Sequence, residues 1–303
     1  MQFKRIKKNV NGVLLLDKPL GFSSNQALQK IKWLYQAAKA GHTGTLDPLA
    51  TGLLPICLGE ATKFAQYVTD ADKTYFATIK LGATTTTGDA EGEVLTTAPV
   101  NVSHAQFAAV CQHFIGEISQ MPPMYSALKH EGKPLYEYAR EGVDIARQPR
   151  VISIKNINVD SFDIDVATIT VNCSKGTYIR TLAEDIGAEL GCGAHLIGLR
   201  RTETAGYLLP QAVTIERLES MSIEARTALL LPVDSAIESL PVVTLNANAT
   251  FYMMQGQAVW QAGKTPHGDL RLYDQNNNFL GLGFLQSDGK IAPKRLIKNN
   301  NCN

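Results

Sequence analysis

The pattern of hydrophobic and polar positions predicts a series of short strands and helices. Residues 12–18 (GVLLLDK) are a nearly continuous apolar run, which is typical of a short buried strand. Residues 73–81 (KTYFATIKL) alternate and are rich in β-branched and aromatic residues, which predicts another strand. Two further strands joined by a tight turn are expected at 151–162 and 165–173, and one more at 193–204.

Helices are expected where the apolar spacing changes to three and four residues. Ser23 or Ser24 can cap a helix that follows the polar turn at 19–21, and Ser103 can cap another that runs to His113. The glycine-rich stretch 39–52 is expected to be irregular. The remaining expected helices cover 59–69, 136–141 and 177–190.

The order of these elements predicts an α+β fold. Hairpins outnumber regular βαβ units, which favours a mixed, mainly antiparallel sheet with flanking helices. A boundary is expected near 232–246, so that residues 1–235 form one domain and residues 241–303 form a second. The second domain is expected to be a small β-barrel-like module, with strand patterns at 256–260, 270–273, 279–285 and 291–297.

The stretch 120–150 stands out within the first domain. It is long and polar, contains four prolines and shows little apolar periodicity. A segment of this length with so little regular structure is more often functional than a plain connector.

Composition narrows the class of protein. With 45% hydrophobic and 19% charged residues, the 303-residue chain has an ordinary soluble composition. No run approaches the roughly 20 apolar residues that span a bilayer. The basic start is followed by an apolar run too short for a signal peptide, so we expect a cytoplasmic protein. The five cysteines are scattered without a C-x-x-C pair, so neither a disulfide framework nor a metal site is expected.

The net charge of +1 hides an uneven distribution. Residues 1–60 carry +5 and residues 240–303 carry +3, whereas 61–150 carry −2 and 151–239 carry −5. Basic ends around an acidic middle indicate either a polyanion held by two separated surfaces or chance clustering of charge.

The segment richest in candidate chemistry is GHTGTLDPLATG (41–52). Its three glycines allow backbone conformations closed to other residues, and Pro48 restricts the residue before it, Asp47. Asp47 is therefore either a rigidly presented catalytic acid or an Asx-turn residue at a proline-containing bend. The loop lacks the Walker and G-x-G-x-x-G spacings, so it is not a phosphate cradle.

Two other segments hold candidate residues. In CSKGTYIRTL (173–182), Arg180 falls in the first turn of a helix, where the dipole disfavours a cation. It either faces solvent or pairs with an anion such as Asp47. Tyr75, near the start of a strand, either stacks on a planar ligand or packs in the core. Of the six histidines only His42 lies beside these motifs, and no second carboxylate stands next to Asp47, which disfavours a two-carboxylate glycosidase.

The motifs occur in an order that resembles a known family. Between about residues 10 and 235 the chain contains, in order, VLLLDKPLGFSS, GHTGTLDPLATG, KTY, CSKGTYIRTLAEDIG and GAHLIGLRRT. The set resembles the TruB-type tRNA pseudouridine synthases, which act on the T-loop uridine (uridine-55). PPMYSALKHEGKPLYEYAREG (122–142) looks like the insertion, about 122–150 here, that the bacterial enzymes use as a thumb over the RNA. The C-terminal residues are similar in size and placement to the family's small PUA-like RNA-binding domain.

The resemblance implies roles for seven residues. Asp47 falls on the family's catalytic aspartate, Tyr75 on the tyrosine that stacks on the target base, and Arg180 on the arginine that pairs with the aspartate. The residues that match other positions around the flipped nucleotide, or that lie in the DKP motif, are His42, Tyr178, Leu199 and Lys18.

The resemblance also implies a reaction and a partner. Uridine becomes pseudouridine when the N1–C1′ bond breaks, the uracil rotates and C5 joins C1′. No atom is gained or lost and nothing is oxidised, so no cofactor is expected. The expected partner is the T-arm stem-loop of tRNA, with no membrane, no obligatory protein partner and a monomeric chain.

Two alternatives stay open at this point. The chain could be a non-catalytic tRNA-binding or folding factor, which the charge distribution and the C-terminal module would also suit. It could also be a guide-RNA-dependent pseudouridine synthase, which shares the catalytic motifs but needs partner proteins. The thumb-like segment argues against the latter.

Overall fold

A nine-stranded mixed sheet forms the centre of the computed structural model, which describes residues 7–261 and 265–298. The outermost residues of both expected domains, 1–6 and 299–303, and residues 262–264 lie outside that description. β3 and β12 pair in parallel, and the other pairs of this sheet are antiparallel, so the expected α+β class is confirmed. In spatial order the path is β1 (Gly12–Lys18), β3 (Ala50–Leu58), β12 (Ala194–Thr204), β4 (Lys73–Leu81), β11 (Val166–Cys173), β10 (Arg150–Asp163) and β7 (Gly116–Gln120), with β2 (Ala40–His42) beside β3 and β13 (Tyr207–Leu208) beside β12.

The strand β1 is buried on both faces. Leu14 and Leu16 pack into the larger core cluster, whereas Val13 and Leu15 pack into a second cluster on the opposite face. Burial of both faces explains why this strand is a continuous apolar run rather than an alternating one.

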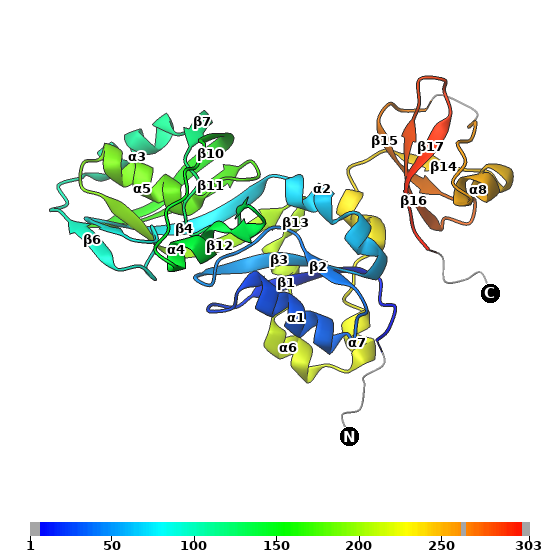
Figure 1. Ribbon diagram of the computed structural model, residues 1–303, viewed down its shortest axis with the longest axis horizontal. Helices are drawn as coiled ribbons and strands as arrows, with labels where there is room; N and C mark the ends of the chain where they lie inside the picture. Colours follow the sequence, from blue (N-terminus) through cyan, green and yellow to red (C-terminus); the bar gives the residue numbers. More distant parts are fainter. Residues whose placement is uncertain (1–6, 262–264, 299–303) are drawn as a thin grey trace.

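Helices pack against the main sheet and lie along its edges (Figure 1). Ser23 caps α1 with a capping box, and Ser103 caps α3 in the same way. The helices and 3-10 turns are α1 (Ser24–Leu34), η1 (Gly59–Lys63), α2 (Ala65–Asp70), α3 (His104–His113), α4 (Leu135–Arg140), α5 (Ile179–Glu189), η2 (Leu209–Gln211), α6 (Ile215–Ser220), α7 (Ile223–Thr227), η3 (Val233–Ile237) and α8 (Ala247–Met254). None of the described helices is long and apolar enough to cross a membrane.

Two small hairpins form separate two-stranded sheets outside the main sheet. One is β5 (Ala83–Thr85) with β6 (Val94–Thr97), and the other is β8 (Lys129–His130) with β9 (Lys133–Pro134). The second hairpin and α4 together make up the regular part of the 122–150 insertion.

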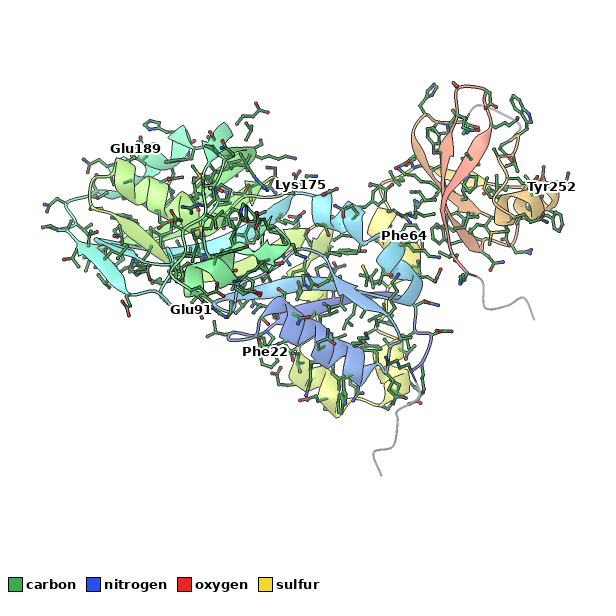
Figure 2. The ribbon with its side chains drawn as sticks, viewed as in Figure 1. Phe22, Phe64, Glu91, Lys175, Glu189 and Tyr252 are labelled. Carbon is green, nitrogen blue, oxygen red and sulfur yellow. The ribbon has the colours of Figure 1, made fainter. Side chains whose placement is uncertain are left out.

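A separate four-stranded sheet is formed by the C-terminal part of the chain (Figure 1). Its spatial order is β14 (Val242–Thr244), β15 (Asp269–Tyr273), β16 (Phe279–Leu285) and β17 (Ile291–Leu296). The two sheets are joined by contacts at the junction of η1 and α2: the ring of Phe64 stands edge-on to that of Phe279 with 5.6 Å between centroids, and Lys63 Nζ donates to the backbone O of Leu296 at 2.7 Å. Figure 2 labels Phe64 at this junction and Tyr252 on α8, far from it.

Three expectations for the elements are corrected, and one helix had not been expected. The stretch 39–52 is not irregular throughout, because it contains β2 and the start of β3. The helix expected over 59–69 is a 3-10 turn and a short α-helix that join at Phe64. Residues 256–260 form only a bridge, from Val259 to Ile291, instead of a strand, and the helix α8 before them was not expected.

Candidate active site

A pocket of about 530 Å³ opens beside the 41–52 loop. Its volume lies within the range of about 300–1,000 Å³ that is usual for sites of small organic ligands. Its walls come from elements distant in sequence: the loop after β2, the end of α2, β4, β12, the start of α5 and residues 126–128 of the insertion. Of the expected site residues, it gathers Asp47, Tyr75, Tyr178, Arg180 and Leu199.

Asp47 is held on a loop that is bonded at several points. The Ser24 hydroxyl donates to the backbone O of Leu46 at 2.9 Å and accepts from the Leu46 N–H at 2.7 Å. The O of Pro48 accepts from the N–H of Gly21, and the O of Asp47 accepts from the N–H of Ala50. The loop therefore presents its carboxylate in one position, as catalysis by a fixed group requires.

Arg180 reaches the Asp47 carboxylate from the first turn of α5. Its Nη2 lies 3.0 Å from Asp47 Oδ2 and donates to the backbone O of Tyr125 at 2.5 Å. Its Nη1 donates to the O of Thr87 at 2.9 Å and lies 3.4 Å from Asp89 Oδ2. Two carboxylates thus supply the negative charge that a buried cation at a helix N-terminus needs.

The Asp47 carboxylate lines the pocket, and protein atoms enclose it on its other sides. Its side chain is 39% exposed, yet the atoms crowded around it exclude much of the bulk solvent. Loss of solvent therefore raises the pKa of Asp47, and Arg180 and Lys18 act against that rise. An aspartate with a raised pKa and a cation bonded to it is a functional candidate on physical grounds.

The two tyrosines stand on different elements of the pocket wall. Tyr75 comes from β4 and is almost fully buried, and burial raises the pKa of its hydroxyl. Tyr178 precedes α5, and its backbone N–H and O are both bonded to the side chain of Gln120. Burial also raises the pKa of Tyr178, so both phenols are protonated at neutral pH.

His42 and Lys18 do not line the pocket. His42 ends β2, and its Nδ1 is buried without a hydrogen-bond partner in the described part of the chain. Lys18 is fully buried at the end of β1, where its Nζ donates to the backbone O of Pro19 at 2.9 Å and of Phe22 at 2.5 Å. Burial lowers the pKa of Lys18 to about 8, while the negative charge of Asp47 acts to raise it.

Three residues of this region were not expected from the sequence. Asp89 is buried in the β5–β6 turn, where its Oδ1 accepts from the Thr87 hydroxyl at 2.5 Å. Lys73 and Arg201 line the pocket as buried cations. Asp89 lies in a plain turn sequence with no motif, whereas Lys73 and Arg201 stand inside KTY and GLRRT and could have been singled out there.

The site is that of an enzyme, with an ion-paired carboxylate and two protonated phenols facing a pocket wide enough for a nucleotide. Within the described ranges, no group of three or more His, Cys, Asp or Glu side chains could hold a metal ion.

Family models match almost the whole chain. Residues 32–179 match the TruB family pseudouridylate synthase N-terminal domain, residues 180–238 the tRNA pseudouridylate synthase B C-terminal domain, and residues 241–297 the Pseudouridine synthase II TruB C-terminal model. The chain is 62% identical over 298 residues to the tRNA pseudouridine synthase B of Methylobacillus flagellatus, with 98% of this chain and 99% of that protein covered. It is 52% identical over 302 residues to the protein of the same name from Pseudomonas fluorescens strain Pf0-1, again with 98% and 99% covered. The chain therefore belongs to the TruB family of pseudouridylate synthases.

Solved structures have a similar fold. A chain in the crystal structure of a Cbf5-Nop10-Gar1 complex superposes with a TM-score of 0.71 at 27% identity, over 95% of this chain and 84% of that one. A chain of the archaeal box H/ACA sRNP Nop10-Cbf5 complex gives a TM-score of 0.71 at 25% identity, over 97% and 88%.

Proposed function

We propose that this protein converts the T-loop uridine of tRNA, uridine-55, to pseudouridine, with Asp47 as the catalytic group. The observation that carries the proposal is the Asp47 carboxylate, held 3.0 Å from Arg180 and open to a pocket that Tyr75 also lines. The names of the relatives at 62% and 52% identity support tRNA as the substrate.

The carboxylate suits the difficult step of this isomerisation. Cleavage of the N1–C1′ bond places positive character on the sugar while uracil leaves as an anion. An ionised Asp47 either stabilises that positive charge or adds as a nucleophile, at C1′ or at C6, and elimination across the sugar is a third route. Arg180 keeps the carboxylate charged and oriented in each case. The substrate and product are isomers, so the reaction balances without an external group.

The other site residues have supporting roles in this proposal. Tyr75 stacks on the freed base and holds it while it turns, and its hydroxyl can relay a proton. Tyr178 and Leu199 close the sides of the pocket around the nucleotide. Lys18 holds the turn at 19–22, which the Gly21 N–H ties to the Asp47 loop through the O of Pro48. His42, at the end of β2, takes the space that the flipped nucleotide vacates.

The substrate must be brought to the pocket in an extruded form. A uridine inside a folded loop is reached only after flipping, at a cost of a few kcal/mol. We assign the insertion 122–150 to cover the RNA, since its residues 126–128 form one wall of the pocket. We assign residues 1–235 to the catalytic domain and 241–303 to RNA binding. The net charges of +5 over residues 1–60 and +3 over 240–303 suit contacts with phosphates.

We further propose that the chain works as a monomer without an obligatory protein partner, in the cytoplasm where tRNA is processed.

The test is direct. The purified protein is incubated with an unmodified tRNA transcript in EDTA, without guide RNA, and pseudouridine is mapped by carbodiimide labelling and primer extension. We expect one stop at the T-loop uridine, and no stop in a control transcript with cytidine at that position. A stop at a different uridine would keep the chemistry and overturn the substrate.

The two alternatives give different results in the same assay. Turnover that appears only after guide RNA and partner proteins are added would favour the guide-dependent class. Tight tRNA binding with no turnover under any condition would favour a binding or folding factor.

A further inference from the structure

Arg201 is a buried cation without a carboxylate partner. It is the largest of the fully buried side chains and has no measurable exposure. Among residues 7–261 and 265–298, no carboxylate oxygen lies within 4.0 Å of its guanidinium, whereas the buried Arg180 has two. Arginine is rarely fully buried unless it is paired, because the lost hydration is costly. The burial of this unpaired positive charge therefore needs an explanation.

The known bonds of Arg201 are to neutral groups. Its Nε donates to the backbone O of Leu53 at 2.7 Å and its Nη2 to the O of Gly44 at 3.2 Å. These bonds tie β12 to β3 and to the Asp47 loop, yet they leave the positive charge uncompensated. The neighbouring Arg200 differs, because its Nη2 lies 2.6 Å from Asp17 Oδ2.

The uncompensated charge lies beside Tyr75. Arg201 and Tyr75 are directly paired residues of the antiparallel strands β12 and β4, so their side chains emerge on the same face of the sheet. Both side chains line the pocket. A methyl group at Gly44, on the Asp47 loop, would lie 3.3 Å from Arg201 Nη1, so the same guanidinium also faces that loop.

We infer that Arg201 is a positioning residue, which orients the Tyr75 hydroxyl and stabilises negative charge on its oxygen during the isomerisation. The inference rests on the proposed function. Formation of pseudouridine removes one proton from C5 and places one on N1, so the proton count is balanced. A phenol can serve both proton transfers. It first gives its Oη proton to N1 of the uracil and becomes a phenolate, and it later takes the proton that leaves C5. A fixed cation next to that oxygen lowers the barrier.

The charges around Tyr75 agree with this role. Burial raises the pKa of its hydroxyl, and the positive charge of Arg201 lowers it. Cys173 on β11 and Asp47 on the loop raise the pKa of Tyr75. Lys73, two residues before Tyr75, is occupied elsewhere, since its Nζ donates to the backbone O of Thr69 at 2.8 Å. Arg201 is thus the cation that faces the phenol.

The experiment combines Arg201→Gln with fluorotyrosine at position 75, introduced by amber suppression. Single-turnover rates are measured at saturating tRNA between pH 6 and pH 9. Arg201→Gln should lower the rate roughly 100-fold, as loss of one preorganised donor does, with KM changed by less than about threefold. Fluorination acidifies the phenol, so fluorotyrosine should recover at least about tenfold of that loss while changing the wild-type rate little. Arg200→Gln is the matched control on the same strand and should keep the wild-type rate.

Each outcome decides the inference. A soluble, folded Arg201→Gln protein whose loss is not recovered by fluorotyrosine, or whose loss is entirely in KM, would overturn it. If Arg201→Gln does not fold, Arg201→Met, which also removes the charge, replaces it, and fluorotyrosine at position 75 serves as a ¹⁹F probe of the phenol pKa. A higher phenol pKa than in the Arg201 protein supports the inference, and an unchanged pKa overturns it. A wild-type protein with no activity on tRNA would instead refute the proposed function, so the two failures are distinguishable.

Discussion

The guanidinium of Arg180 bridges Asp47 and Asp89, with 3.0 Å from Nη2 to Asp47 Oδ2 and 3.4 Å from Nη1 to Asp89 Oδ2. The two carboxylates differ in access, because the side chain of Asp47 is 39% exposed and that of Asp89 only 2%. One of them can therefore meet a substrate, while the other holds the arginine from behind.

Asp47→Asn should abolish turnover and leave tRNA binding intact. The amide keeps the size and shape of the carboxylate but has no charge with which to stabilise the sugar or attack the base. We expect a loss of roughly 10³-fold or more in the single-turnover rate. Filter binding of tRNA should change by less than about threefold. A normal rate in this variant would remove Asp47 from the catalytic role.

The same variant separates catalysis from any effect on RNA folding. A tRNA refolding assay is run with wild-type protein and with Asp47→Asn. Full refolding benefit without turnover would reveal a second, non-catalytic role, and no benefit from either protein would exclude one under those conditions.

Asp89→Asn should impair catalysis from outside the pocket. Its loss leaves Arg180 partly unpaired in a buried site, which typically costs about 3–5 kcal/mol when one partner is removed. We expect a lower Tm and a rate reduced roughly 10- to 100-fold, because the guanidinium can shift away from Asp47. Glu93→Gln, an exposed acid four residues further on, is the control and should change neither Tm nor rate. An unaltered rate in Asp89→Asn would mean that Asp47 orients Arg180 alone.

The acid limb of the pH profile should lie above the range of an ordinary aspartate. Burial raises the pKa of Asp47 above the usual value of about 3.9, and Arg180 opposes that rise. Only the ionised form is active in the proposal, so kcat/KM should fall as the pH drops through this raised pKa. In Arg180→Gln the opposing charge is gone, and the midpoint of the acid limb should move to higher pH. A midpoint at or below that of wild type would show that the limb does not report Asp47.

The strands with strong patterns could be predicted from the sequence. The strands at 12–18 and 73–81 have the predicted bounds, because a doubly buried run and a clear alternation each leave little choice. β3 was missed because Gly52 and Pro55, two residues typical of turns, lie inside it. Pro55 is tolerated there because it lies between residues 50–52, which pair with β12, and 56–58, which pair with β2.

The site could be predicted only where a motif marks it. The Asp47 loop and Arg180 stand in distinctive segments, and the helix dipole made an anionic partner such as Asp47 one of two alternatives for Arg180. Asp89 contributes through a contact across 91 residues of sequence, between a turn and the start of a helix. Such a pairing depends on tertiary packing, which no local pattern records.

Gly52→Ala should disrupt the junction that carries the pocket. Gly52 has φ of +97°, and a methyl group there would lie 2.4 Å from the backbone O of Arg201 on the parallel strand β12. The strained backbone and the steric overlap both destabilise the variant, so we expect its free energy of unfolding to fall by about 3 kcal/mol or more. The catalytic rate should fall as well, because Arg201 and the Asp47 loop move apart.

Gly21→Ala is the matched control. Its φ of +81° imposes a similar backbone strain of about 1–2 kcal/mol, but no atom lies within 4 Å of the added methyl. Thermal melts and single-turnover rates of both variants separate the two causes: equal losses of stability would show that the close approach of β3 to β12 is not needed, and a larger loss at Gly52 would show that it is.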